Sequence, residues 1–167
     1  LGNYRIPEAA RALQEFVDDM SNWYVRRCRD RFWAKGMEQD KVNAYMTLYT
    51  ALVTVCKAAA PMIPFMTEEI YQNIVRSVDA SAKESIHLCD FPVYNAEQVD
   101  EKLEADMDLV LKIVVLGRAC RNGAAIKNRQ PIGQMYVKAE ASLPDYDEAI
   151  ILDELNVKNI TFTDDVS

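Results

Sequence analysis

The sequence predicts a mainly helical protein, an antiparallel helical bundle followed by a small C-terminal β-α-β appendage. Apolar residues recur at helical spacing over most of the chain, and Pro7, Pro64 and Pro131 fall at the ends of these segments. Near the C-terminus the apolar pattern changes to that of short strands around one helix. We therefore expect a helical bundle over residues 1–131 and a small, incomplete α+β appendage over residues 132–167.

The first predicted helix begins near Pro7 and ends before Gly36. At about 100° per residue, its apolar residues fall within about 60° of Leu13 and form a core stripe. Beyond the stripe the helix is basic and aromatic on all sides, which indicates that its tip extends past the core. The predicted core stripe consists of Leu13, Phe16, Val17, Met20, Tyr24 and Cys28.

Two further helices are expected before residue 77. One begins near Asp40 as N-cap and is apolar on most faces, so it should be the most buried element. The next begins at Pro64. Residues 77–94 read as an extended loop.

A long helix should follow the loop. It starts at the capping-box-like pair Asn95 and Gln98, and Gly117 would allow a neighbouring helix to approach closely. In the appendage, the predicted strands cover residues 134–139 and 157–162, with a helix over residues 147–155 between them.

The net charge of −7 conceals two basic segments. Residues 26–35 carry five cations and one acid, and residues 118–129 carry four cations and no acid, so each segment has a charge of +4. The remainder of the chain has a charge of −15. The acidic balance therefore describes the solvated faces and does not exclude a local site for phosphate.

Several classes of site are excluded. The single histidine, His87, cannot supply a pair of metal ligands, and the four cysteines are too far apart for a CxxC zinc motif. The sequence has neither a glycine-rich phosphate loop nor a GxSxG motif. The acidic pairs Asp18–Asp19 and Glu68–Glu69 read as solvated surface. No apolar run approaches the roughly 18 residues of a membrane span. The chain begins with Leu1 and no leader follows, so we interpret it as a piece of a longer protein.

The first basic segment combines arginines with large aromatic side chains. Arginine binds phosphates and base edges, and aromatic rings stack on unpaired bases, so the combination favours single-stranded RNA. Arg29 and Trp33 lie off the core stripe and fit RNA contact, whereas Tyr24 lies on it and fits the core. Trp23 fits either interpretation. Arg27 and Arg31 lie on the side of the stripe, so one of them is expected to form a structural ion pair.

Four segments resemble the anticodon-binding domain of isoleucyl-tRNA synthetase, a class I aminoacyl-tRNA synthetase. They stand in the family's order, and the first and third resemble the isoleucine enzyme more than the valine, leucine or methionine enzymes. The four segments are NWYVRR with RDRFW at residues 22–33, APMIPFMTEEIY at 60–71, SIHLCDFP at 85–92 and KNRQP at 127–131.

The resemblance implies part of a cytoplasmic ligase that joins isoleucine to its tRNA with ATP. The family's catalytic signatures, editing domain and zinc modules are not in this sequence, so no catalytic residue, cofactor or metal is expected here, and neither a membrane nor DNA is an expected partner. The partners it implies are the anticodon arm of tRNA(Ile) and the rest of the synthetase chain. The family bundle also has a helix upstream of Tyr4, and without it part of the first helix's apolar face would be uncovered.

Together with side-chain chemistry, the resemblance implies two groups of RNA-binding residues. Cys28 replaces a small polar residue that is common in the family, which argues against an RNA hydrogen bond there. Two alternatives stay open: the same domain of a related synthetase such as the valine enzyme, or a non-catalytic helical domain that binds an acidic protein. The first group is Trp23, Arg26, Arg27, Arg29, Arg31, Trp33 and Lys35, and the second is Arg121, Lys127, Asn128, Arg129 and Gln130.

Overall fold

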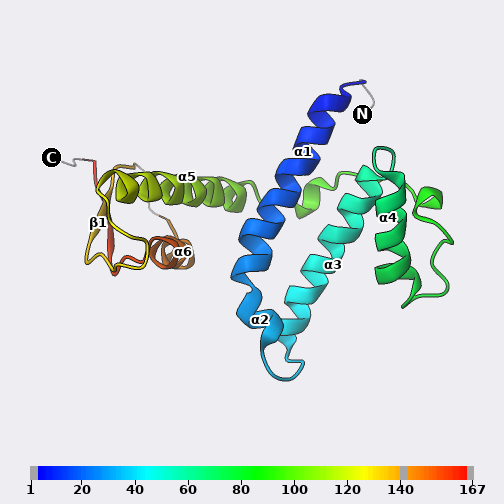
Figure 1. Ribbon diagram of the computed structural model, residues 1–167, viewed down its shortest axis with the longest axis horizontal. Helices are drawn as coiled ribbons and strands as arrows, with labels where there is room; N and C mark the ends of the chain where they lie inside the picture. Colours follow the sequence, from blue (N-terminus) through cyan, green and yellow to red (C-terminus); the bar gives the residue numbers. More distant parts are fainter. Residues whose placement is uncertain (1–3, 140–142, 165–167) are drawn as a thin grey trace. The chain divides into compact units, whose positions relative to one another are not determined.

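The computed structural model describes residues 4–139 and 143–164 of the chain (Figure 1). It is mainly helical with one small sheet, which confirms the predicted fold class. The chain divides into two compact units, Leu1–Tyr94 and Asn95–Ser167. This division precedes the predicted boundary at residue 131, because the long helix packs on the helix of the appendage. That the long helix also completes the bundle of the first unit stays a prediction.

The first unit begins with a helical run that breaks into three pieces. Pro7 lies in its first turn, and beyond its end Gly36 has a φ of +78°, a conformation that favours glycine. The middle piece is a π-helical turn, which is rare in proteins and often occurs at functional sites. The three pieces are α1 (Ile6–Asp19), η1 (Met20–Val25) and α2 (Arg29–Trp33).

The rest of the first unit packs on this run and on itself. Pro64 begins a helix as predicted, and Glu68 in that helix accepts hydrogen bonds from Ser85 Oγ and the Ile86 N–H. The expectation that Glu68 is only solvated surface is therefore wrong, since its carboxylate fixes the loop that follows. The remaining elements are α3 (Gln39–Ala59), α4 (Pro64–Tyr71), the π-helical η2 (Gln72–Arg76) and the 3₁₀ helix η3 (Ile86–Leu88).

Two small apolar cores hold the first unit together. One joins Cys28 and Phe32 of the first run to Ala44 of α3. The other surrounds Tyr71, whose hydroxyl donates to the carbonyl of Lys83. Both cores are formed where α3 meets a neighbouring helix.

The predicted apolar faces are less buried than expected. On α1, Phe16 and Val17 are 47% and 42% exposed and line shallow apolar grooves beside α3. The expectation that α3 is the most buried element is wrong, since its Tyr45, Met46 and Tyr49 are exposed. In the described part of this unit α3 packs on its neighbours along only part of its surface.

Two predicted helix starts shift in the structure. α3 begins after Glu38, so Asp40 lies inside its first turn and pairs with Arg31 instead of capping the helix. Asn95 caps only a short 3₁₀ helix, and the true N-cap of the long helix is Asp100, whose carboxylate accepts from the Leu103 N–H.

The second unit contains the β-α-β appendage and the long helix. The two strands are parallel, with Met135 opposite Ile160 and Val137 opposite Phe162, and a helix makes the crossover between them. This confirms the predicted order of elements. The elements are η4 (Ala96–Gln98), α5 (Glu101–Gly123), β1 (Met135–Val137), α6 (Asp145–Leu155) and β2 (Ile160–Phe162).

α5 and α6 pack closely around Gly117. Val110 and Val114 of α5 and Ile151 of α6 are fully buried. A side chain at Gly117 would collide with the buried Leu155 side chain of α6. The predicted close approach at Gly117 is therefore confirmed.

α6 also buries a carboxylate. Asp147 is 1% exposed, and among the described residues neither of its carboxylate oxygens has a hydrogen-bond donor. Burial raises the pKa of Asp147, Asp106 of α5 raises it further, and Lys102 opposes the shift. Lys102 is itself bound to Asp106, at 2.6 Å.

Replacing Gly117 with Ala should lower the free energy of unfolding by about 1–3 kcal/mol, because the added methyl group meets Leu155 in a packed interface. Urea unfolding measures this loss. Gly123→Ala is the matched control, since open space surrounds that position at the end of the same helix. An equal loss in both variants would show that close packing is not the cause.

Replacing Asp147 with Asn should raise the free energy of unfolding by about 1 kcal/mol near pH 7, because the described structure gives the buried carboxylate no donor. The raised pKa of Asp147 means that the fold takes up a proton before the unfolded chain does as pH falls. The wild type should therefore regain stability relative to the variant as pH falls through the folded-state pKa, and the gain should be complete below about pH 4. Urea unfolding of both proteins between these pH values tests this, and a constant difference would contradict it.

Candidate nucleic-acid interface

The first basic segment lies where the first helical run ends and the chain turns back into α3 (Figure 1). The arginines divide as the helical wheel predicts: Arg26 and Arg29 are exposed, whereas Arg27 is half-buried. Trp33 is 77% exposed at the end of α2, and Lys35 is exposed in the following loop. The segment thus presents cations and one large aromatic ring to solvent.

Two of these arginines lie over tryptophan rings. The Arg29 guanidinium is 5.8 Å from the centre of the Trp33 ring, one helical turn away. The Arg26 guanidinium is 5.7 Å from the centre of the Trp23 ring, and its Nε donates to the Asn22 carbonyl. Trp23 is half-buried, so it both packs and contributes to the surface. Such pairs hold the guanidinium in place beside the ring.

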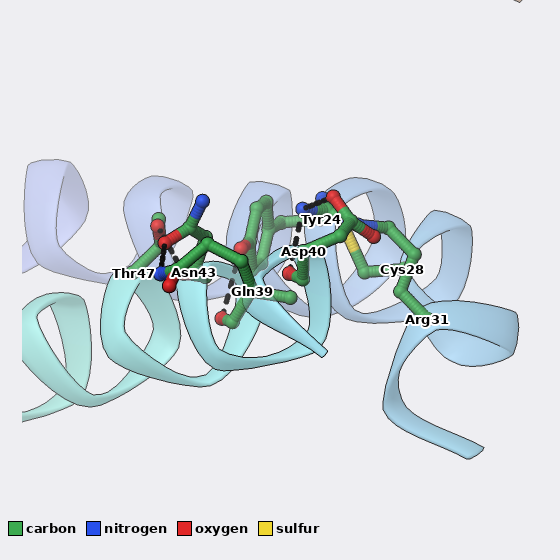
Figure 2. A network of polar contacts seen from close by, with 8 residues as sticks. Tyr24, Cys28, Arg31, Gln39, Asp40, Asn43 and Thr47 are labelled. Carbon is green, nitrogen blue, oxygen red and sulfur yellow. Dashed lines mark hydrogen bonds and ion pairs between the residues drawn. The ribbon is translucent and has the colours of Figure 1, made fainter. Parts of the chain in front are cut away.

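Arg31 is the structural member of this segment. Its Nε and Nη2 donate to the two carboxylate oxygens of Asp40 at 2.8 and 2.7 Å, and Nη2 also donates to the Asp40 carbonyl (Figure 2). The Arg31 hydrogen bonds lower the pKa of Asp40, which keeps the carboxylate ionised. The bidentate pair fixes α2 against α3, so Arg31 forms a structural ion pair of the kind expected for one of the two arginines on the side of the stripe.

Tyr24 belongs to the core, as predicted. It is half-buried, and its hydroxyl donates to the Ala44 carbonyl at 3.0 Å. Burial raises its pKa. Figure 2 shows Tyr24 and Cys28 facing α3 beside the Arg31–Asp40 pair. Position 28 is therefore a packing position, which agrees with the expectation that Cys28 makes no RNA contact.

The second basic segment, at the end of α5, differs from its prediction at one residue. Arg121 is 3% exposed, and all its hydrogen bonds in the described structure go to backbone carbonyls. A side chain in this position cannot bind RNA directly, so its predicted RNA contact is wrong for this conformation. Arg118 also forms an ion pair within the protein, because its Nη2 lies 2.6 Å from the Glu154 carboxylate.

The other four predicted residues of this segment form an exposed turn. The Gln130 N–H donates to the Lys127 carbonyl at 2.9 Å, which closes a β-turn over Lys127, Asn128, Arg129 and Gln130. All four residues are exposed. We call this segment the 127–130 turn.

Asn156 supports this turn, although no sequence motif marks it as a site residue. Asn156 ends α6 with a φ of 49°, and its side-chain amide donates to the Asn128 carbonyl at 3.3 Å. An asparagine directly after a predicted helix is a known signal for this left-handed end. Its contact with a turn 28 residues earlier has no signal in the sequence.

Within residues 4–139 and 143–164, no three His, Cys, Asp or Glu side chains lie together as a metal site would require. In the same residues no helix is long and apolar enough to cross a membrane. The arrangement instead offers two cationic surfaces, one on each compact unit, and the first includes an exposed indole.

Comparison with known proteins gives a consistent result. The chain matches the family described as the anticodon-binding domain of tRNA ligase over residues 1–137. It is 56% identical to an isoleucine–tRNA ligase of Clostridium novyi and 55% identical to one of Clostridium acetobutylicum, over all 167 residues of this chain and 16% of each relative. A ligase of the same name from Dehalococcoides mccartyi is 46% identical over 95% of this chain and 16% of its own length.

The chain therefore spans about one sixth of the length of these relatives. The family match covers the whole first unit and continues through α5 to β1. It thus includes both cationic surfaces described above. By its sequence, this chain belongs to the family of anticodon-binding domains of tRNA ligases.

Proposed function

We propose that this domain recognises the anticodon stem-loop of tRNA(Ile) within an isoleucine–tRNA ligase. The observation that carries the proposal is the exposed Trp33 indole with the Arg29 guanidinium above its ring, at the end of a helix. An exposed indole can stack on an unpaired base, and an adjacent guanidinium can bind phosphate or a base edge. An anticodon loop offers both unpaired bases and phosphates.

The names of the relatives support the isoleucine enzyme over the valine enzyme. In the proposed whole protein, ATP and L-isoleucine react to form an adenylate with release of diphosphate, and transfer to tRNA(Ile) releases AMP. This chemistry belongs to parts of the protein outside residues 1–167. We place ATP there, and also the zinc expected from the resemblance, because the family's catalytic signatures and zinc modules do not occur in this sequence. The cytoplasm is the compartment in which this role is proposed.

The remaining exposed cations take a supporting role in this proposal. Arg26 and Lys35 extend the surface around Trp33, and Arg27 lies half-buried beside them. Lys127 and Arg129 project from the 127–130 turn of the second unit, where they would contact phosphates. Arg31 contributes by fixing α2, since its Nε and Nη2 donate to Asp40 and its Nη1 donates to the Cys28 sulfur.

The double substitution Arg29→Glu with Trp33→Ala should weaken binding of tRNA(Ile) at least about tenfold, because it removes one stacking surface and reverses one charge. Filter binding or fluorescence anisotropy with the full-length protein measures the loss. Arg11→Glu is the matched control, since Arg11 is exposed on α1 outside both basic segments. Unchanged tRNA affinity in the double variant would instead favour a domain that binds an acidic protein.

Changing the anticodon of tRNA(Ile) should weaken its binding to the full-length protein, because the proposed contacts are made to the anticodon loop. The panel consists of tRNA(Ile), the same tRNA with an altered anticodon, and tRNA(Val), all at one moderate salt concentration. Preference for tRNA(Val) would favour the valine enzyme. Equal affinity for all three would contradict specific recognition.

A further inference from the structure

We infer that Arg121 is a positioning residue, which holds the 127–130 turn in the shape that presents Lys127 and Arg129 to phosphates. The inference rests on the proposed function, in which those two side chains contact RNA. It assigns Arg121 a role through the turn and not through direct contact, since the side chain is buried.

One nitrogen of Arg121 fixes both ends of the turn. Nη1 donates to the carbonyl of Lys127 and to the carbonyl of Gln130, each at 3.0 Å. The same Lys127 carbonyl accepts from the Gln130 N–H. A turn that is bound at its first and last residues has little freedom to open, so its two central residues stay in place.

The other terminal nitrogen anchors the turn to a helix. Nη2 donates to the carbonyls of Leu155 and Asn156, at the C-terminal end of α6. Carbonyls at a helix end lack partners within the helix and carry partial negative charge, so they bind a cation well. Arg121 thereby joins the turn to an element that is itself packed on α5.

The same contacts separate the polar groups of the turn that bind the protein from those that face solvent. The carbonyls of Lys127 and Gln130 point to Arg121, and the carbonyl of Asn128 accepts from the Asn156 side chain. These partially negative oxygens would repel a phosphate if they faced solvent. With them engaged beneath the turn, the exposed groups include the cationic side chains of Lys127 and Arg129.

Arg121 also retains its charge. Its hydrogen-bond partners in the described structure are carbonyls, and no carboxylate neutralises it there. A buried positive charge close beneath the turn adds to the attraction for phosphate. Only arginine offers enough donors in a fixed plane to reach four carbonyls together, so lysine is an incomplete substitute.

The test compares Arg121→Met with Arg118→Met in the full-length protein. Arg118 lies on the same helix and pairs with Glu154, and its side chain is 43% exposed, so its replacement removes a cation and an ion pair from α5 without a contact to the turn. Affinity for tRNA(Ile) is measured over a range of KCl concentrations. We expect Arg121→Met to weaken binding about five- to tenfold and to lower the slope of log K against log[KCl] by about one, while Arg118→Met changes neither.

A second measurement separates positioning from general damage to the fold. The same Arg121→Met substitution is made in a protein that already carries Lys127→Ala and Arg129→Ala. If Arg121 acts through those side chains, Arg121→Met should weaken the affinity for tRNA(Ile) by less than about twofold in that background. Arg121→Lys should bind tRNA(Ile) with an affinity between those of the wild type and Arg121→Met. If Arg121→Met loses its helical circular dichroism, Arg121→Lys takes its place in both comparisons.

The outcomes separate this inference from the proposed function. If Lys127→Ala with Arg129→Ala leaves tRNA affinity unchanged, the turn does not bind RNA and both ideas fail at this site. If that double variant binds weakly but Arg121→Met and Arg121→Lys bind normally, only the positioning role is wrong. An equal loss from Arg121→Met in both backgrounds, or from Arg118→Met, would also overturn it.

Discussion

Arg121 places a positive charge where water scarcely reaches, and such a charge is tolerated only if its donors are satisfied. Its partners come from the end of α6 and from the 127–130 turn, which are far apart in sequence. The formation of the turn is therefore coupled to the packing of α6 against the end of α5. Next to these contacts, Ile132 pairs with Val157 and begins the alignment of β1 with β2. One guanidinium thus links the end of α5, the turn and the end of α6, beside the apolar packing that holds α5 against α6.

In the first unit an arginine also joins two elements, but its partner is a carboxylate. Arg31 spans from α2 to the carboxylate of Asp40 in α3, and this pair is half-exposed, so it contributes geometry more than stability. In each unit at least one arginine is bound within the protein, while other cations of the same segment, such as Arg29 and Arg129, are exposed. The cations of a basic segment therefore do not all have the same role. Some bind the protein and fix the backbone, and the others are held at the surface, where they can contact RNA.

The sequence was sufficient for the order of elements and for most of the division among the arginines, because both follow from local periodicity. It was insufficient where distant contacts decide: nothing near Arg121 distinguishes it from Arg129, since two of its four carbonyl partners, those of Leu155 and Asn156, lie over 30 positions away. The wheel also fails for Phe32, about 100° from Leu13 at helical spacing yet buried. The π-helical turn explains this, because its wider turns advance each residue by a smaller angle and so rotate α2 relative to α1.

The charge of the chain takes on a different meaning once these pairs are placed in space. Asp40 lies outside the first basic segment in sequence but binds Arg31, so the local charge there falls from +4 to +3. Glu154 does the same for Arg118 in the second segment. The two surfaces stay positive while the rest of the chain is strongly negative and repels phosphate. Attraction limited to two small areas favours a few placements of an RNA over many, so the acidic balance supports selective binding where it first suggested none.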